Sequence, residues 1–162
     1  MNKDWESYYK IQKPPSPLLI EALEYIKGVK ALDAGCGAMQ DTRYLISKNF
    51  HVLAFDSSPF VKDIAKENNF PFVKATFEEF FGIPKAYDLI SAQWALPFER
   101  PDKFNKIFDG LKKSLNKDGI FTGHFFGKKD SWANNPDMTF HSEEEVKNLL
   151  EGLEIIKFKE IE

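Results

Sequence analysis

Short apolar runs alternate along this chain with longer stretches in which apolar residues recur every three or four positions. The short runs predict strands buried on both faces, and the longer stretches predict helices with one buried face. Because strands and helices alternate, the pattern favours a parallel sheet joined by helical crossovers. The expected strands span residues 29–32, 51–56, 70–74, 87–93, 120–127 and 153–161. The expected helices span residues 17–28, 41–48, 58–68, 101–115 and 142–152.

Local signals define the ends of several of these elements. Ser16 and Ser58 each precede a proline and are expected to cap the helices that follow them. Asp41 is the expected N-cap of the helix after residues 35–37. Pro71 restricts the run at residues 70–74 to an edge strand, because proline cannot donate a hydrogen bond to a neighbouring strand.

Composition narrows the class of protein. The chain has 162 residues, which is enough for one domain with a sizeable core. Its net charge is −3, so the sequence does not predict the basic surface that nucleic-acid binding needs. Its single cysteine provides no disulfide framework, so a reducing cytoplasm is the expected compartment. The three histidines are far apart, and no apolar run reaches membrane length. We therefore expect no metal, nucleic-acid or membrane partner.

A glycine loop follows the first buried run. Asp33 ends that run, Gly35-Cys36-Gly37 follows, and a helix begins a few residues later. Glycine allows a sharp turn and a close approach of the backbone to a ligand. The dinucleotide fingerprint requires a third glycine where Gln40 stands, and an acid beside the loop suits a ligand that carries an ammonium group. We interpret Cys36 as a residue whose small side chain fits the glycine loop, with a catalytic thiol as the minor alternative.

A second acid supports a nucleotide site. Asp56 ends the next apolar run, a little over twenty residues beyond the glycine loop, where this kind of fold places the acid that binds ribose hydroxyls. A carboxylate offers two oxygens to two adjacent hydroxyls. Together with the element order, these acids predict an α/β fold, with a doubly wound, mostly parallel Rossmann-like sheet and helices on both faces.

The run Asp33-Ala34-Gly35-Cys36-Gly37 resembles motif I of class I S-adenosylmethionine-dependent methyltransferases, with Met39 in the place of a further glycine. More of the chain is similar to small bacterial methyltransferases of the tellurite-resistance type. The matching segments are residues 41–45, 55–59, 95–98, 117–119, 126–127, 130–132 and 139–142. The resemblance implies an enzyme that binds S-adenosylmethionine and transfers its methyl group to a small-molecule acceptor, leaving S-adenosylhomocysteine.

The resemblance also assigns residues. It implies that Asp33 faces the methionine ammonium and that Asp56 holds the ribose, while Thr76 and Phe77 lie beside the adenine, where Thr76 could equally be a helix N-cap. The implied cofactor-binding residues are Asp33, Gly35, Cys36, Gly37, Asp56, Ser57, Thr76, Phe77, Gln93 and Trp94. The implied substrate-side residues are Tyr8, Tyr9, Leu96 and His124.

No residue is assigned as catalytic, because the sulfonium methyl is already electrophilic and the protein must mainly align the reactants. The sequence contains no Asn/Asp-Pro-Pro-Tyr, which argues against methylation of a nucleobase or of glutamine. Two alternatives stay open. One is a cofactor-binding accessory domain without catalysis. The other is a nicotinamide oxidoreductase, which the missing third glycine disfavours.

Two expectations concern the ends of the chain. Residues 1–15 form an aromatic N-terminal segment, interpreted either as a lid over the cofactor or as packing at the edge of the domain, which spans residues 16–162. The resembled fold inserts a seventh strand beside the fifth, and residues 153–161 provide only a sixth. We therefore expect the final seventh strand to be missing and the edge of the fifth strand to pair with the last strand or with a second copy, giving a homo-oligomer.

Overall fold

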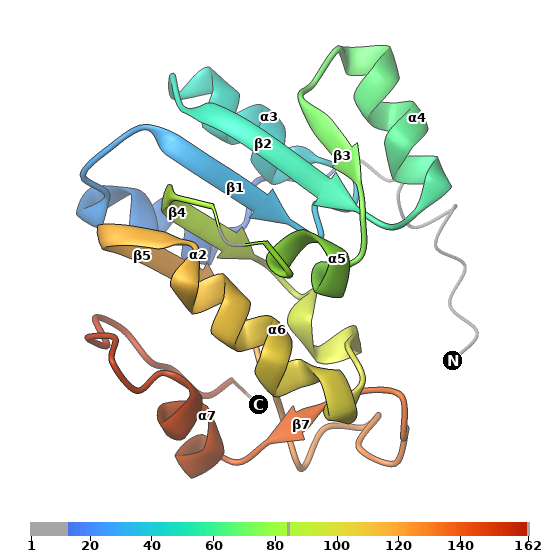
Figure 1. Cartoon of the computed structure of the whole chain (residues 1–162), viewed down its shortest axis with the longest axis vertical. Helices are drawn as coiled ribbons and strands as arrows, with labels where there is room; N and C mark the ends of the chain where they lie inside the picture. The colour runs from blue at the N-terminus through green and yellow to red at the C-terminus, as the bar shows by residue number, and fades with distance from the viewer. Residues whose placement is uncertain (1–12, 84, 162) are drawn as a thin grey trace.

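The computed structural model describes residues 13–83 and 85–161, and its centre is a five-stranded parallel sheet (Figure 1). The strand order is β3-β2-β1-β4-β5, so the chain moves outward from β1 in one direction and then returns to the other side. The strands are β1 (Lys30–Ala34), β2 (His51–Asp56), β3 (Phe72–Lys74), β4 (Tyr87–Ala92) and β5 (Leu115–Gly123). This order places a crevice between β1 and β4, where the direction of winding changes.

Helices cover both faces of the sheet. On one face, α5 (Phe77–Phe81) and α6 (Pro101–Lys113) bury an aromatic core around Phe55 and Ile90. On the other face lie α2 (Pro17–Ala22), with the 3₁₀ turn η1 (Leu23–Tyr25), α3 (Gln40–Ser47) and α4 (Pro59–Asn68). Successive residues of β1, Ala31 and Leu32, face opposite cores, as strand geometry requires. The predicted doubly wound fold is confirmed.

Beyond the main sheet, the chain forms a smaller unit. A 3₁₀ turn, η2 (Leu96–Phe98), follows β4, and a two-stranded sheet joins β6 (Phe126–Gly127) to β7 (Phe140–His141). Helix α7 (Glu143–Leu149) follows β7 and begins with a capping box, in which Ser142 and Glu145 bond reciprocally to each other's backbone. Figure 1 shows this part of the chain on the far side of α6 from β1 and β2.

Two expected caps differ in the structure. The N-cap of α3 is Met39, in the left-handed conformation with φ 66°, and not Asp41. Asp41 instead accepts bonds from the backbone N–H and the hydroxyl of Ser16, at 2.7 and 2.8 Å. Ser16 occupies the N-cap position of α2 but makes no side-chain cap bond, and its hydroxyl donates to Asp41. Ser58 does cap α4, by accepting the N–H of Phe60.

Two expected strands also need correction. The run at residues 120–127 is interrupted, because β5 ends at Gly123 and residues 126–127 pair with β7. Residues 153–161 form no strand, although their apolar and polar residues alternate. Four of their apolar side chains are at least 39% exposed, and Lys157 pairs with Glu21 of α2 at 2.6 Å. Alternation alone did not make a strand here, because the segment has no paired backbone neighbour in the described chain.

Candidate cofactor and acceptor site

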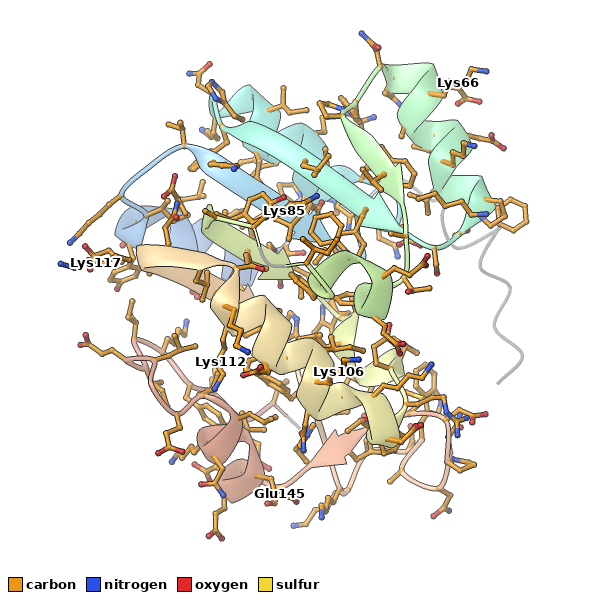
Figure 2. All side chains as sticks on the ribbon, viewed as in Figure 1. Lys66, Lys85, Lys106, Lys112, Lys117 and Glu145 are labelled. Atoms are coloured by element: carbon orange, nitrogen blue, oxygen red, sulfur yellow. The ribbon has the colours of Figure 1, made fainter. Side chains whose placement is uncertain are left out.

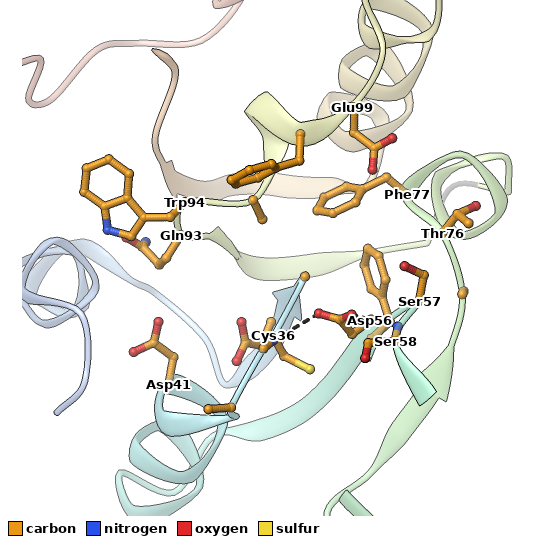
Figure 3. A pocket seen from close by; sticks show the side chains of 18 of the residues that line it. Cys36, Asp41, Asp56, Ser57, Ser58, Thr76, Phe77, Gln93, Trp94 and Glu99 are labelled. Atoms are coloured by element: carbon orange, nitrogen blue, oxygen red, sulfur yellow. Dashed lines mark hydrogen bonds between the residues drawn. The ribbon is translucent and has the colours of Figure 1, made fainter. Parts of the chain in front are cut away.

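One cavity of about 750 Å³ opens at the carboxyl ends of β1, β2, β3 and β4. The loops that leave these strands form its wall, and η2 and residues from the two-stranded sheet region complete it. Figure 3 shows Asp41 and Asp56 on one side of the opening and Gln93, Trp94, Phe77 and Glu99 on the other. A volume of this size is within the range typical of small-molecule sites.

All ten predicted cofactor-binding residues lie in the wall of this cavity. They are Asp33, Gly35, Cys36, Gly37, Asp56, Ser57, Thr76, Phe77, Gln93 and Trp94. The parallel sheet brings them together, since each lies at or just beyond the carboxyl end of one of its neighbouring strands.

The predicted substrate-side residues are placed differently. Leu96 is fully buried in the core and does not line the cavity. His124 does not line the cavity but packs on Trp94: the two rings stack at 3.6 Å, and the backbone N–H of Trp94 donates to His124 Nδ1 at 3.2 Å. Tyr8 and Tyr9 lie outside the described residues.

The glycine loop folds tightly under the cavity. Gly35 and Cys36 donate their backbone N–H groups to the Phe55 carbonyl at 2.9 and 3.0 Å. Gly35 has φ 67°, and a Cβ on it would lie 2.7 Å from the Ala95 Cβ and 3.1 Å from the Phe77 ring. Only glycine fits here, because both the backbone angle and the space exclude a side chain.

Asp56 links the loop to the second strand. Its Oδ2 accepts the Gly37 N–H at 3.1 Å, and its Oδ1 accepts the Ser58 N–H at 2.9 Å. Burial raises the pKa of Asp56, while these backbone N–H groups lower it. Each oxygen keeps a further lone pair, so the carboxylate can still accept two hydroxyls from a ligand.

Asp33 is the most deeply buried acid of the cavity. Its side chain accepts the Thr42 hydroxyl at 2.6 Å, and only 2% of the residue is exposed. Burial is the main cause that raises its pKa to about 7, and the charges of Asp41 and Asp56 add to the effect. A cation placed in the cavity would relieve this crowding of carboxylates.

The surroundings of Cys36 argue against a role as a nucleophile. Burial raises the pKa of its thiol well above the ordinary value, and the charges of Asp33 and Asp56 raise it further. The thiolate is the reactive form of cysteine, so the protonated thiol is inert. Cys36 instead packs with Met39 and Ala54 below the loop, which supports the steric interpretation.

Some wall residues were not predicted. Gln40 and Asp41 start α3, and their nearness to the cavity follows from the path of the loop, for which the sequence carries no separate signal. Phe98 and Trp132 do lie in segments that carry the family resemblance. The further wall residues are Ser16, Ala38, Gln40, Asp41, Phe55, Ser58, Pro59, Phe60, Ala75, Ala95, Phe98, Glu99, Phe126 and Trp132.

The strand order, the glycine loop and the acid that ends β2 together define the class I S-adenosylmethionine-dependent methyltransferase fold. The chain belongs to the family described as tellurite resistance protein TehB, whose model matches residues 3–161. This match confirms the predicted resemblance. No curated protein matches the chain.

Solved structures agree with this fold. The crystal structure of TehB from Haemophilus influenzae has 18% identity and a TM-score of 0.79, over 97% of this chain and 58% of that one. A Burkholderia thailandensis 1,6-didemethyltoxoflavin-N1-methyltransferase, solved with its substrate and S-adenosylhomocysteine, has 21% identity and a TM-score of 0.65, over 93% and 67%. An Archaeoglobus fulgidus S-adenosylmethionine-dependent methyltransferase has 19% identity and a TM-score of 0.55, over 60% and 45%.

The match covers 45% of the Archaeoglobus fulgidus chain and 58% of the Haemophilus influenzae TehB chain, so this chain spans about half of their length. In the described part of the chain, no helix has the length and apolar character needed to cross a membrane.

Proposed function

We propose that this protein transfers a methyl group from S-adenosylmethionine to a small-molecule acceptor. The observation that supports the proposal most strongly is one cavity that contains both strand-end acids, the glycine loop and the exit of β4. Family membership and solved relatives that contain S-adenosylhomocysteine point the same way.

The wall of the cavity fits the cofactor. Asp56 would hold the two ribose hydroxyls, and Gly35 and Gly37 let a ligand lie against the backbone. The Gln40 Oε1 is buried without a hydrogen-bond partner and would accept an N–H donor. Asp33, with Asp41 beside it, would attract the ammonium group of the methionine moiety.

Phe77 and Ser57 would flank the adenine. The sequence left Thr76 with two interpretations, a residue beside the adenine or a helix N-cap. Its hydroxyl accepts the Glu79 N–H at 3.1 Å and caps α5, and the residue also lines the cavity. We assign Thr76 to the cap and the cavity wall, and Phe77 to the apolar surface against which the base would pack.

When bound, S-adenosylmethionine supplies the electrophile: its sulfonium carbon–sulfur bond breaks, the electron pair stays on sulfur, the acceptor's lone pair forms the new bond, and any acceptor proton leaves to solvent. This chain's residues would orient the reactants and exclude water. Orientation of this kind contributes up to about 7–11 kcal/mol in favourable cases. No residue of the cavity is assigned as a general base.

Three further parts of the proposal concern the domain bounds, the cellular compartment and the oligomeric state. We propose one domain over residues 16–162 and a cytoplasmic location, because a single buried cysteine suits a reducing compartment. We also propose a homo-oligomer that forms through β5, which pairs only with β4 in the described chain.

A methyl-transfer assay tests the proposal. Purified protein is incubated with radiolabelled S-adenosylmethionine and a panel of small thiols, amines, phenols and oxyanions, and label in the acceptor is counted. Turnover of at least one acceptor that disappears in Asp56→Ala supports the proposal. Cofactor binding without transfer to any acceptor would favour the accessory-domain alternative.

A further inference from the structure

The order of the strands divides the cavity into two ends. Asp33 is in β1, Asp56 ends β2, and Thr76 and Phe77 follow β3, while β2 lies between β1 and β3. Under the proposed function, the ammonium group of the methionine moiety lies at Asp33 and the ribose at Asp56. The base attached to that ribose would therefore lie beyond Asp56, at Thr76 and Phe77.

Glu99 lies at this same end of the cavity, although it comes from a different part of the sheet. It follows η2, after β4, and it lines the cavity wall. Figure 3 shows Glu99 with Phe77 and Thr76 at one end of the cavity and Asp41 at the other. The carboxyl group of Glu99 is therefore placed where the base would lie.

The backbone of Glu99 is fixed from two sides. Its N–H donates to the Leu96 carbonyl at 3.0 Å, and its carbonyl accepts the Thr139 hydroxyl at 2.7 Å. The next residue, Arg100, pairs with Asp102 at 3.2 Å. A residue whose backbone is held in this way loses little conformational freedom when its side chain binds a ligand.

The carboxylate of Glu99 has acceptor capacity for a ligand. Among the residues that the structure describes, its side chain makes no hydrogen bond and no ion pair. Burial is the main cause that raises the pKa of Glu99, while the charge of Lys103 lowers it and the charge of Glu78 raises it. An N–H donor placed against the carboxylate would favour its ionised form.

The two glutamates that follow Phe77 are engaged with other residues. Glu79 accepts the Thr76 backbone N–H at 3.0 Å in the capping box of α5, and Glu78 pairs with Lys103 at 3.1 Å. Neither glutamate lines the cavity. The Thr76 hydroxyl accepts the Glu79 N–H, and a neutral hydroxyl is a weaker acceptor than a carboxylate. An amino group on the base would therefore find its strong acceptor in a carboxylate from another element.

We propose that Glu99 accepts a hydrogen bond from the exocyclic amino group of the adenine and thereby selects an adenine-based cofactor over one with a 6-oxo purine base. The inference rests on the proposed function and adds a specificity-determining residue to it. An amino group donates to a carboxylate, whereas a carbonyl oxygen at the same ring position would face it as a second acceptor. Two acceptors without a shared proton repel, so the base with the carbonyl would bind more weakly.

The test compares two ligands that differ in the base alone. S-adenosylhomocysteine and S-inosylhomocysteine, in which a carbonyl replaces the 6-amino group, are titrated separately into the protein by calorimetry. Because the ribose and homocysteine parts are identical, the ratio of the two affinities reports on recognition of the base. We expect the wild-type protein to bind S-adenosylhomocysteine at least tenfold more tightly than S-inosylhomocysteine.

Glu99→Gln should change the preference for the base and not merely weaken binding. The amide of glutamine can donate to a carbonyl oxygen, so S-inosylhomocysteine should bind at least threefold more tightly to this variant than to the wild type. S-adenosylhomocysteine should lose about threefold to tenfold in affinity, because the charged acceptor is gone. Glu99→Ala removes the carboxylate without adding a donor, and it should narrow the preference mainly by weakening S-adenosylhomocysteine.

Glu67→Gln is the matched control, because it makes the same chemical change on an exposed glutamate of α4 that does not line the cavity. The residue before it, Lys66, lies on this helix at the outer edge of the molecule (Figure 2). The control should keep the wild-type ratio of affinities within about twofold. Unfolding in urea verifies that each variant is folded.

The outcomes separate the inference from the proposed function. Equal affinity of the wild-type protein for the two ligands overturns the inference and leaves the proposed function standing. The same holds if Glu99→Gln weakens both ligands equally, since that result indicates a structural role, or if both variants of Glu99 keep the wild-type ratio. Failure of the wild-type protein to bind S-adenosylhomocysteine at all overturns the proposed function and, with it, the inference.

Discussion

Asp33 carries its carboxyl group at the end of β1, where burial and two neighbouring carboxylates raise its pKa to about 7. Near neutral pH, part of the protein therefore has this group protonated. A bound ammonium or sulfonium ion favours the ionised form and lowers the pKa. By linkage, cofactor affinity should rise with pH up to about 8 and fall as pH decreases through 7.

Calorimetry in two buffers of different ionisation enthalpy should thus detect proton release when S-adenosylmethionine binds at pH 7. Asp33→Asn should remove the release and flatten the pH profile. Thr42→Val removes a hydrogen bond that lowers the pKa of Asp33, so its profile should move to higher pH. A wild-type profile that is flat between pH 6 and 8 would refute this role of Asp33.

Asp56 is the second acid of the site, and its replacement by alanine should weaken S-adenosylmethionine binding strongly. A hydrogen bond to a charged group contributes about 1.5–3 kcal/mol, which corresponds to roughly ten- to hundredfold in affinity. Asp63→Ala, an exposed acid on α4, is the control. Because Asp56 also accepts the Gly37 N–H, circular dichroism should verify that the fold survives. Unchanged affinity would exclude Asp56 from the site.

The two acids could be predicted because each follows an apolar run, and parallel strands bring their carboxyl ends together. The same reasoning predicted Leu96 and His124 wrongly, since neither lines the cavity. Both follow a strand closely in sequence, yet Leu96 turns into the core and His124 packs on Trp94. The direction in which a loop side chain points depends on tertiary packing, for which these segments carry no periodic signal.

At the level of elements, helix α3 shows how packing can outweigh local preference. Met39 is its N-cap in the left-handed conformation, where glycine is the usual residue, and its side chain is fully buried with Cys36 and Val61. The resembled motif has a further glycine in the place of Met39, which by itself would favour tolerance of Met39→Gly. Because the side chain is buried, the packing lost on its removal should outweigh the backbone strain that glycine would relieve.

Met39→Gly should relieve about 1–2 kcal/mol of backbone strain but leave a cavity that costs about 2–5 kcal/mol. We expect a net loss of about 1–3 kcal/mol in the free energy of unfolding, measured with urea, and cofactor affinity within twofold because Met39 does not line the cavity. Asn69→Gly is the control, since Asn69 has φ 56° but is exposed. It should be neutral or stabilising, and a stabilised Met39→Gly would contradict this account.

Elements with strong local signals were predicted well. The edge position of β3 followed from Pro71, and Thr76 is the N-cap of α5, as one of the two interpretations of its position expected. Residues 116–119 form an irregular start of β5, with a register shift against β4 and Asp118 at φ 64°. Residues 153–161 failed as a strand because pairing requires a partner edge, which a sequence pattern does not specify.

For the whole molecule, the two edges of the sheet differ. Pro71 precedes β3 and Lys74 is its last residue, and both discourage pairing there, whereas β5 is long and pairs only with β4 in the described chain. Association through β5 should appear in sedimentation velocity as a coefficient that rises with protein concentration. Hydrogen exchange should show added protection in β5 but none in β3. A sedimentation coefficient that stays monomeric at the highest soluble concentration would argue against the oligomer.

The central expectation is that the cavity at the ends of β1, β2 and β4 binds S-adenosylmethionine and its product. Isothermal titration of the wild-type protein with S-adenosylhomocysteine, and separately with NAD, tests it directly. We predict saturable one-to-one binding of S-adenosylhomocysteine and no binding of NAD, because Gln40 stands where the dinucleotide fingerprint needs a glycine. Saturable binding of NAD, or no heat from S-adenosylhomocysteine, would contradict the account.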